Sequence, residues 1–221
     1  VRMKPILCNY YVTYRCNSAC SYCDIWKIDK FRQADDCLLD DVLEILPQLK
    51  SLGVKFIDFT GGEPLLHPYL PEMLHAAKRL KFYTSVTTNC LLYPRRADEI
   101  RGLVDLLHFS LDSLDEEKND RIRSKGSYQK VMESLEIARR YHENPDLLFT
   151  ATDQNYQEID RLCQFAQRQK RILIVNPVFS YSGQKKISHL ALDYLDRFKS
   201  KPYIYINRAF HRFIRSGGNH R

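Results

Sequence analysis

Three cysteines that fall within eight residues give the clearest chemical signal in this sequence. Cys16, Cys20 and Cys23 are spaced CxxxCxxC in the stretch CNSACSYC. Thiolates are soft ligands that select zinc, copper(I) or iron–sulfur clusters. A closed zinc site usually takes four protein ligands from paired units such as CxxC, and the chain has no second CxxC. Three thiolates on a four-iron cluster leave one iron open, which is the arrangement that chemistry needs.

A second motif, Gly61-Gly62-Glu63-Pro64, follows an alternating run over residues 54–60 that is typical of a strand. Glycine lets the backbone approach a ligand closely or adopt a positive φ. Glu63 adds an anion facing whatever binds there. The alternative interpretation is a tight turn between a strand and a helix.

Polar residues also follow the next two predicted strands. Thr88 and Asn89 come after residues 82–87, and Ser110 and Asp112 come at the end of residues 104–111. These side chains could hydrogen-bond a ligand. Asn89 could instead serve a turn, since Asn favours turns, and Asp112 could instead cap the next helix.

These motifs resemble the radical S-adenosylmethionine (SAM) superfamily. Its signature is CxxxCxΦC with an aromatic residue at Φ, where this chain has Tyr22, and a GGEP motif ends its second strand. The resemblance implies that Cys16, Cys20 and Cys23 hold a [4Fe–4S] cluster whose fourth iron binds SAM. One electron then splits SAM into methionine and a 5′-deoxyadenosyl radical, which abstracts a hydrogen from the substrate.

The resemblance also implies which residues bind SAM. Gly61, Gly62 and Glu63 would hold its amino group, and Tyr22 and Asn89 would lie close by. The positions expected on the ribose, the carboxylate or the adenine are Ser110, Asp112, Arg123 and Asn176. Arg121 and Lys125 compete with Arg123 for the carboxylate, and a solvated run of charges is an equal alternative.

The rest of the chain alternates strand and helix patterns. Apolar residues recur at helical spacing over 38–52 and predict a helix there. Pro47 counts against this prediction because an interior proline kinks or breaks a helix. Asp35 or Asp36 could cap the start of the helix. Helices are also predicted from Pro68, near 95–101, over 127–141 and from Asn155, and residues 27–36 are predicted to be loop. The predicted strands are 6–15, 54–60, 82–87, 104–111, 147–152 and 172–179.

This alternation predicts an α/β fold with a parallel sheet. Eight such units close a barrel at about 250 residues, so six would form a partial (βα)6 TIM-like barrel, which is also the fold that the resemblance implies. Residues 190–213 are predicted to form one or two amphipathic helices. We therefore expect a barrel domain at 1–183 and a C-terminal helical extension at 184–221. Every candidate site follows a strand, and ligands bind at that edge of α/β folds.

Composition limits the function classes. A chain of 221 residues suits one domain, and no apolar run reaches the ~18 residues of a membrane helix. The start at Val1 does not resemble a signal peptide, and the seven cysteines suit reduced thiols, so we expect a cytoplasmic protein. The remaining cysteines are expected in the core, with Cys37 the one candidate for a fourth zinc ligand. The net charge of +7 is either a solvated surface or a sign of an acidic partner.

We therefore expect a radical SAM enzyme that resembles the branch containing molybdenum cofactor biosynthesis protein A and peptide-modifying maturases. Its substrate would be a small molecule, nucleotide or peptide, and its electron donor a reduced flavodoxin or ferredoxin. The alternatives are a maturase whose auxiliary domain is absent from this chain, or a non-catalytic metal- or nucleic-acid-binding protein on the same barrel. The GGEP motif disfavours the non-catalytic alternative, and we expect neither a membrane nor nucleic acid as partner.

Overall fold

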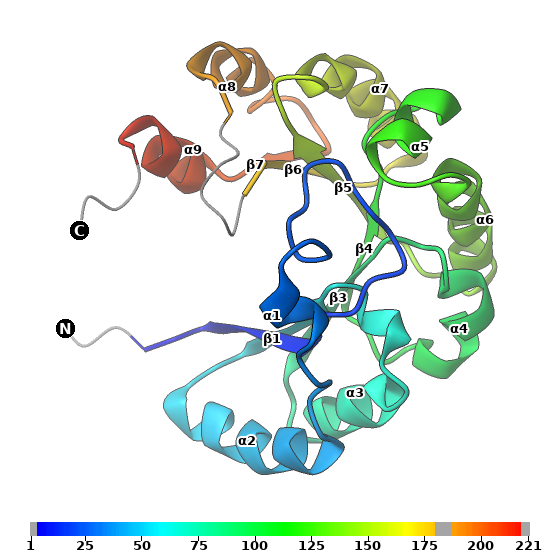
Figure 1. The fold of residues 1–221 in the computed structure, drawn as a ribbon, viewed down its shortest axis with the longest axis vertical. Coiled ribbons are helices and arrows are strands. Elements are labelled where there is room, and N and C mark those ends of the chain that lie inside the picture. Colours follow the sequence, from blue (N-terminus) through cyan, green and yellow to red (C-terminus); the bar gives the residue numbers. More distant parts are fainter. Residues whose placement is uncertain (1–3, 180–186, 218–221) are drawn as a thin grey trace.

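The computed structural model describes residues 4–179 and 187–217, and their strands form one parallel sheet in chain order. Figure 1 shows this sheet as a crescent whose edges are the first and the last strand. The described strands are β1 (Leu7–Thr13), β2 (Phe56–Gly61), β3 (Tyr83–Thr88), β4 (Leu106–Ser110), β5 (Asp146–Ala151), β6 (Leu173–Pro177) and β7 (Ile204–Ile206).

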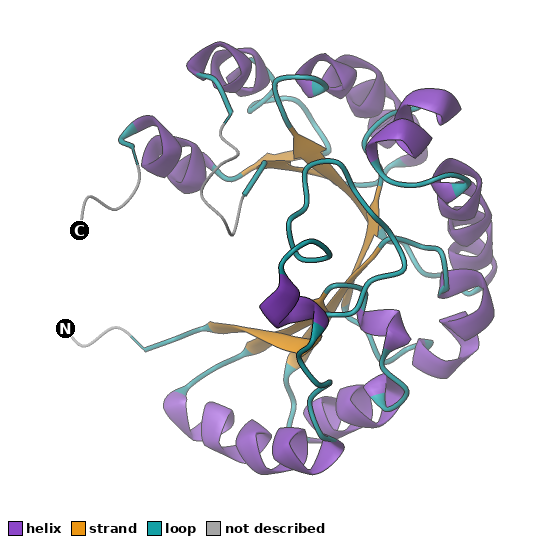
Figure 2. Cartoon of the chain, viewed as in Figure 1, coloured by secondary structure: helices purple, strands orange, loops and turns teal. Residues whose placement is uncertain are grey.

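Helices form a layer along the outer side of this sheet, as Figure 2 shows. The short α1 (Asp29–Arg32) differs, because it lies with the loop after β1 across the middle of the crescent (Figure 1). None of the described helices is long and apolar enough to cross a membrane. The outer helices are α2 (Leu39–Leu52), α3 (Leu70–Arg79), α4 (Tyr93–Ile100), α5 (Glu116–Ile122), α6 (Ser127–Arg140), α7 (Ile159–Gln169), α8 (His189–Asp196) and α9 (Arg208–Arg215), with 3₁₀ turns at η1 (Pro64–Leu66) and η2 (Tyr156–Glu158).

The partial barrel is therefore confirmed, but with a seventh strand in the segment that was predicted to be helical. In β7, Ile204 pairs with Leu173 and Ile206 with Val175. A three-residue strand is too short to show a period in the sequence, and the exposed edge of β6 supplies its hydrogen bonds. The helices α8 and α9 in the same segment are confirmed. The predicted boundary between residues 183 and 184 lies outside the described residues.

Two other local predictions were wrong. Residues 27–36 were predicted to be loop, but they contain the one-turn helix α1. Neither Asp35 nor Asp36 caps α2, whose N-cap is Leu38 without a side-chain hydrogen bond. Asp36 instead accepts hydrogen bonds from Thr13 and Arg15. The α2 helix runs unbroken through Pro47, which lies on its exposed side.

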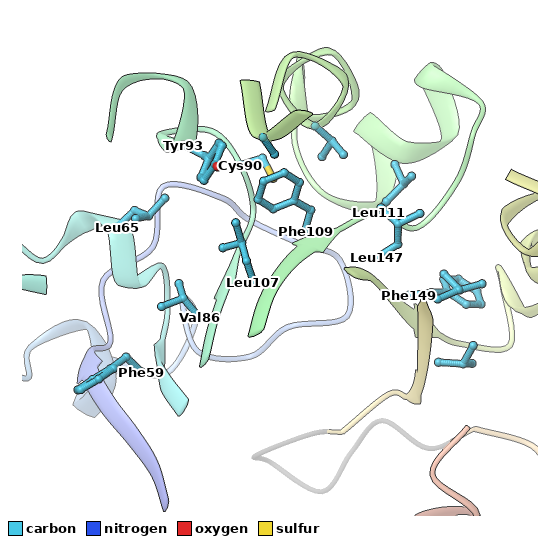
Figure 3. Packing of buried hydrophobic residues seen from close by; sticks show 14 of the residues in the cluster. Phe59, Leu65, Val86, Cys90, Tyr93, Leu107, Phe109, Leu111, Leu147 and Phe149 are labelled. Atoms are coloured by element: carbon cyan, nitrogen blue, oxygen red, sulfur yellow. The ribbon is translucent and has the colours of Figure 1, made fainter. Parts of the chain in front are cut away.

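The core lies between the sheet and the outer helices (Figure 3). Alternate residues of each strand point to opposite faces of a sheet, and the outward ones, such as Phe59, Phe109 and Phe149, are fully buried. Each such side chain contributes about 1.5–3 kcal/mol by its burial. The inward residues are mostly half-buried, as the alternating pattern of β5 shows. The interior of the crescent is thus not filled like the core.

Candidate functional site

The loop that carries the three cysteines starts directly after β1 and is fixed at several points. The carbonyl of Cys20 accepts from the Cys23 amide at 3.1 Å and from Trp26 Nε1 at 3.1 Å. The Ser21 amide donates to the carbonyl of Ile122 at 2.8 Å, which ties the loop to the end of α5. The three thiols are therefore held at the carboxyl edge of the sheet.

The surroundings of Cys16 disfavour a bare thiolate and favour one that is bound to a cation. Burial raises the pKa of Cys16 to about 12, a backbone hydrogen bond from Ser18 opposes this, and the neighbouring Glu63, Cys20 and Cys23 raise it further. A bound metal stabilises the thiolate that such surroundings disfavour. In the described part of the chain, no three Cys, His, Asp or Glu side chains stand close enough to enclose one metal ion. Three soft thiols on one loop are the donors that an iron–sulfur cluster takes, so the donor set fits a cluster.

Cys37, the candidate fourth zinc ligand, does not belong to this loop. Its Sγ lies 3.9 Å from Nε2 of His67, and its amide donates to the carbonyl of Val12 at 3.0 Å. Cys90 and Cys163 are buried in the core as expected, and Cys8 is half-buried against it. The chain's seven cysteines are all free.

The two glycines of the GGEP motif dock it onto the end of β1. A Cβ on Gly61, whose φ is +146°, would lie 2.0 Å from the carbonyl oxygen of Thr13, and one on Gly62 would lie 2.2 Å from that of Arg15. The amide of Gly62 donates to Thr13 at 2.8 Å, and that of Glu63 donates to Arg15 at 2.9 Å. The close approach expected toward a ligand is therefore made to the strand that leads into the cysteine loop.

Glu63 is buried and holds three hydrogen bonds. Oε1 accepts from the Leu65 amide at 3.1 Å and from Thr88 Oγ1 at 2.8 Å, and Oε2 accepts from the Asn89 amide at 2.7 Å. Burial raises the pKa of Glu63 to about 7, and these hydrogen bonds oppose the rise. An ionised carboxylate has about four acceptor sites, so one remains for a donor outside this network.

Asn89 connects the Glu63 network to the cysteine loop. Its Nδ2 donates to Oδ1 of Asn17 at 2.8 Å and lies 3.8 Å from Sγ of Cys16. Asn17 was not predicted, and its place between the first two cysteines is the one sequence signal that could have indicated it. Thus β2, β3 and the loop after β1 converge on one cluster of hydrogen bonds.

Tyr22, Asp112 and Arg123 form a second polar cluster at the loop, in which Asp112 and Arg123 are buried and Tyr22 is half-buried. Tyr22 Oη donates to Asp112 Oδ2 at 3.0 Å, and Arg123 Nε lies 2.8 Å from the same oxygen as an ion pair without hydrogen-bond alignment. The Arg123 guanidinium also lies 5.8 Å from the Tyr22 ring centre. Asp112 Oδ1 accepts from the Thr150 amide at 2.9 Å. Both carboxylate oxygens of Asp112 are thus engaged within the protein.

The electrostatics of this cluster follow from burial and from the ion pair. Burial raises the pKa of Tyr22, and Asp112 adds to the rise while Arg123 opposes it. Burial lowers the pKa of Arg123, but Asp112, Tyr22 and Cys20 together raise it by more. Arg121 and Lys125 line an outer hollow with acidic residues of α5. Of the three competing cations, Arg123 contacts Tyr22 of the cysteine loop, and Arg121 also lines a hollow with Ser21 of that loop.

The other candidate residues lie at the same edge or inside the crescent. Ser110 is buried at the end of β4, and Asn176 is half-buried on β6, where it lines an interior hollow. Asn155, expected as a helix cap, instead accepts from Thr152 through Oδ1 at 2.7 Å and donates to the carbonyl of Thr150 at 3.0 Å. The roles of all these residues toward SAM stay predictions.

Comparison with known proteins agrees with this geometry. The chain is 36% identical to the GTP 3′,8-cyclase of Chlorobaculum tepidum over 128 residues, which cover 57% of this chain and 38% of that protein. It is 31% identical to a probable GTP 3′,8-cyclase of Archaeoglobus fulgidus over 183 residues, which cover 79% of this chain and 61% of that protein. The chain thus spans less than two thirds of either relative.

A structural comparison shows the same fold. Streptococcus suis SuiB bound to S-adenosylmethionine superposes with a TM-score of 0.75 at 20% identity, over 92% of this chain and 51% of that one. Residues 10–166, most of the chain, match the Radical SAM superfamily. The resemblance inferred from the cysteine and GGEP motifs is confirmed, and the chain belongs to the radical SAM superfamily of enzymes.

Proposed function

We propose that this chain binds a [4Fe–4S] cluster and SAM and abstracts a hydrogen atom from a substrate by radical chemistry. Cys16, Cys20 and Cys23 would hold the cluster. When bound, that cluster supplies the electron that splits SAM into methionine and a 5′-deoxyadenosyl radical. The observation that carries this proposal is the hydrogen-bonded path from Glu63 through Asn89 to the loop of Cys16.

The SAM amino group would take the remaining acceptor site of Glu63. Gly61 and Gly62 contribute by fixing that carboxylate against the end of β1. We propose that Asp112 contacts the ribose or carboxylate of SAM and also orients Tyr22 and Arg123, which it contacts. The remaining proposed contacts, to the ribose, carboxylate or adenine, are Ser110, Arg123 and Asn176.

The proposed electron donor is a reduced flavodoxin or ferredoxin. A surface hollow of about 780 Å³ is lined by Cys16 and Trp26 together with the cations Lys27 and Arg32. Opposite charges steer association and raise its rate, so an acidic donor suits this face. A reducing compartment such as the cytoplasm suits the free cysteines.

The substrate is proposed only as a class. The relatives are named GTP 3′,8-cyclases, which favours a nucleotide, and SuiB has also been crystallised with its precursor peptide SuiA, which favours a peptide. A maturase whose auxiliary domain is absent from this chain therefore stays the second candidate.

The test is anaerobic reconstitution with iron and sulfide, followed by counting iron and detecting 5′-deoxyadenosine after adding SAM and dithionite. We expect about four irons per chain and SAM cleavage, both lost in Cys20→Ala. Cys163→Ala is the matched control, because this cysteine is buried in the core on α7 away from the loop. A single bound zinc without SAM cleavage in the wild-type protein would refute the proposal.

A further inference from the structure

The interior of the crescent contains a hollow of about 370 Å³ that none of the proposed cluster ligands lines. This volume falls in the range of small-molecule sites. Its lining side chains come from six successive strands. They occupy the inward-facing positions, which alternate along each strand with the outward-facing positions of the core. Those side chains are Leu7, Asn9, Phe56, Asp58, Ser85, Thr87, Leu106, His108, Leu148, Ile174 and Asn176.

The lining has an apolar and a polar part. Leu7 and Phe56 pair with each other at the start of β1 and β2 and give the apolar part together with Leu106, Leu148 and Ile174. Two residues further along the same strands, Asn9 pairs with Asp58, and Asp58 pairs in turn with Ser85 of β3. A complete barrel is filled by layers of branched apolar side chains. The polar part here is therefore not explained by packing.

Asp58 has unused acceptor capacity in this hollow. Ser85 Oγ donates to its Oδ1 at 2.7 Å, and a carboxylate offers about four acceptor sites. His108 adds a buried Nδ1 that has no hydrogen bond among the described residues and lies 3.5 Å from Asp146. Asp58 thus presents acceptor sites in the hollow to a ligand that brings donors.

The charge of the hollow is opposite to that of the whole chain. The protein has 34 Lys and Arg residues and a net charge of +7, yet neither residue type is found among the described residues that line the hollow. Asp58 is the carboxylate within it, and Asp146 lies next to it beside His108. An anionic group such as a phosphate or a carboxylate would meet no Lys or Arg among the described residues of this lining.

We propose that this hollow binds the polar end of the substrate, and that this end is a neutral or cationic hydrogen-bond donor such as an amine or amidine, held by Asp58 and Ser85. The inference rests on the proposed function, because it assigns the substrate of that radical chemistry to the interior hollow. A carboxylate and an amidinium form charge-assisted bidentate hydrogen bonds, roughly twice as strong as neutral ones. A nucleotide would therefore place its base in the hollow and its phosphates outside.

The test compares three probes of the same shape: benzamidine, benzamide and benzoate. Each has an apolar ring for the apolar part of the hollow, and only the charge of the polar group changes. Binding to the reconstituted full chain is measured by isothermal titration calorimetry in saturating SAM, so that the proposed cofactor site is filled. We expect benzamidine to bind at least tenfold tighter than benzoate, about 1.4 kcal/mol, with benzamide between them.

Asp58→Asn removes the charge, and Asp35→Asn is the matched control on an exposed loop. We expect the benzamidine preference to fall to within about twofold in Asp58→Asn and to be unchanged in Asp35→Asn. If Asp58→Asn does not fold, the imidazole resonances of His108 in the wild-type protein report the location, since benzamidine and not benzoate should shift them. Equal binding of benzamidine and benzoate, or an unchanged preference in Asp58→Asn, would overturn the proposal.

SAM cleavage is measured in the same preparation without probes. It distinguishes a failure of the hollow assignment from a failure of the proposed radical chemistry. Cleavage without charge-selective binding refutes only the assignment of the hollow. Charge-selective binding that Asp58→Asn abolishes, in a protein that binds no cluster, supports the hollow and refutes the radical chemistry.

Discussion

Replacing Gly62 by alanine should separate the cysteine loop from the GGEP motif. The added Cβ would lie 2.2 Å from the carbonyl oxygen of Arg15 and 2.7 Å from that of Tyr14. Ordinary contact between such atoms needs about 3.5 Å, so the two backbones must separate by about 1 Å. Gly62 is not in the left-handed region of φ, so the whole effect comes from this collision.

The magnitude follows from the two hydrogen bonds that join these backbones. The bonds from Gly62 to Thr13 and from Glu63 to Arg15 are 2.8 and 2.9 Å long, and a separation of this size breaks both. Each backbone hydrogen bond contributes about 0.5–1.5 kcal/mol, and a buried group left unpaired costs about 1–3 kcal/mol. We expect Gly62→Ala to lower the free energy of unfolding by about 2–4 kcal/mol. The thermal midpoint should fall by about 5–15 °C.

Gly102→Ala is the control for this prediction. Gly102 has a φ of +70°, and a Cβ added there would meet no atom within 4 Å, so only backbone strain of about 1–2 kcal/mol is expected. Both variants are measured by thermal unfolding of the reduced, cluster-free protein at one scan rate. If Gly62→Ala is as stable as Gly102→Ala or more so, the close approach of the two backbones does not hold the loop, and the reasoning fails.

Three further predictions concern burial and charge. Arg123→Met leaves Asp112 as a buried, unpaired carboxylate and should cost about 3–5 kcal/mol in urea unfolding; Asp112→Asn added to it should recover part of that loss, and no recovery would contradict the pairing. The raised pKa of Glu63, about 7 against 4.5 in the unfolded chain, means that the folded protein binds the extra proton. The stability of the cluster-free protein should therefore fall as pH rises from about 4.5 to about 7, by roughly 3 kcal/mol, and Glu63→Gln should flatten this slope. Phe109→Ala should cost about 3–5 kcal/mol because the side chain is fully buried, whereas Phe213→Ala, at an exposed position, should leave the urea midpoint nearly unchanged.

Local patterns were enough to predict most of the strands and helices. The alternation in β2 and the three-and-four spacing in α2 are properties of a few neighbouring residues, so they are visible in the sequence. β7 could not be predicted in this way. Three residues carry no period, and Ile204–Ile206 become a strand because β6 offers an unpaired edge.

The candidate site likewise has features that the sequence predicts and contacts that only the structure shows. The spacing of Cys16, Cys20 and Cys23 predicts a metal centre without any structure. The contact between Tyr22 and Asp112 joins residues 90 positions apart, and no local pattern specifies it. The GGEP motif was visible in the sequence, but its close packing against the end of β1 depends on the tertiary structure.

By itself, the sequence determined the thiol spacing, the GGEP motif and the alternating elements, because each depends on side chains close together along the chain. Only the tertiary structure decided which side chains meet. Strand register brings Asn9, Asp58 and Ser85 side by side in the interior, and the fold brings Tyr22 to Asp112 from 90 positions away in the chain. These contacts depend on the curvature of the sheet and on the packing of the core, and both are properties of the whole fold.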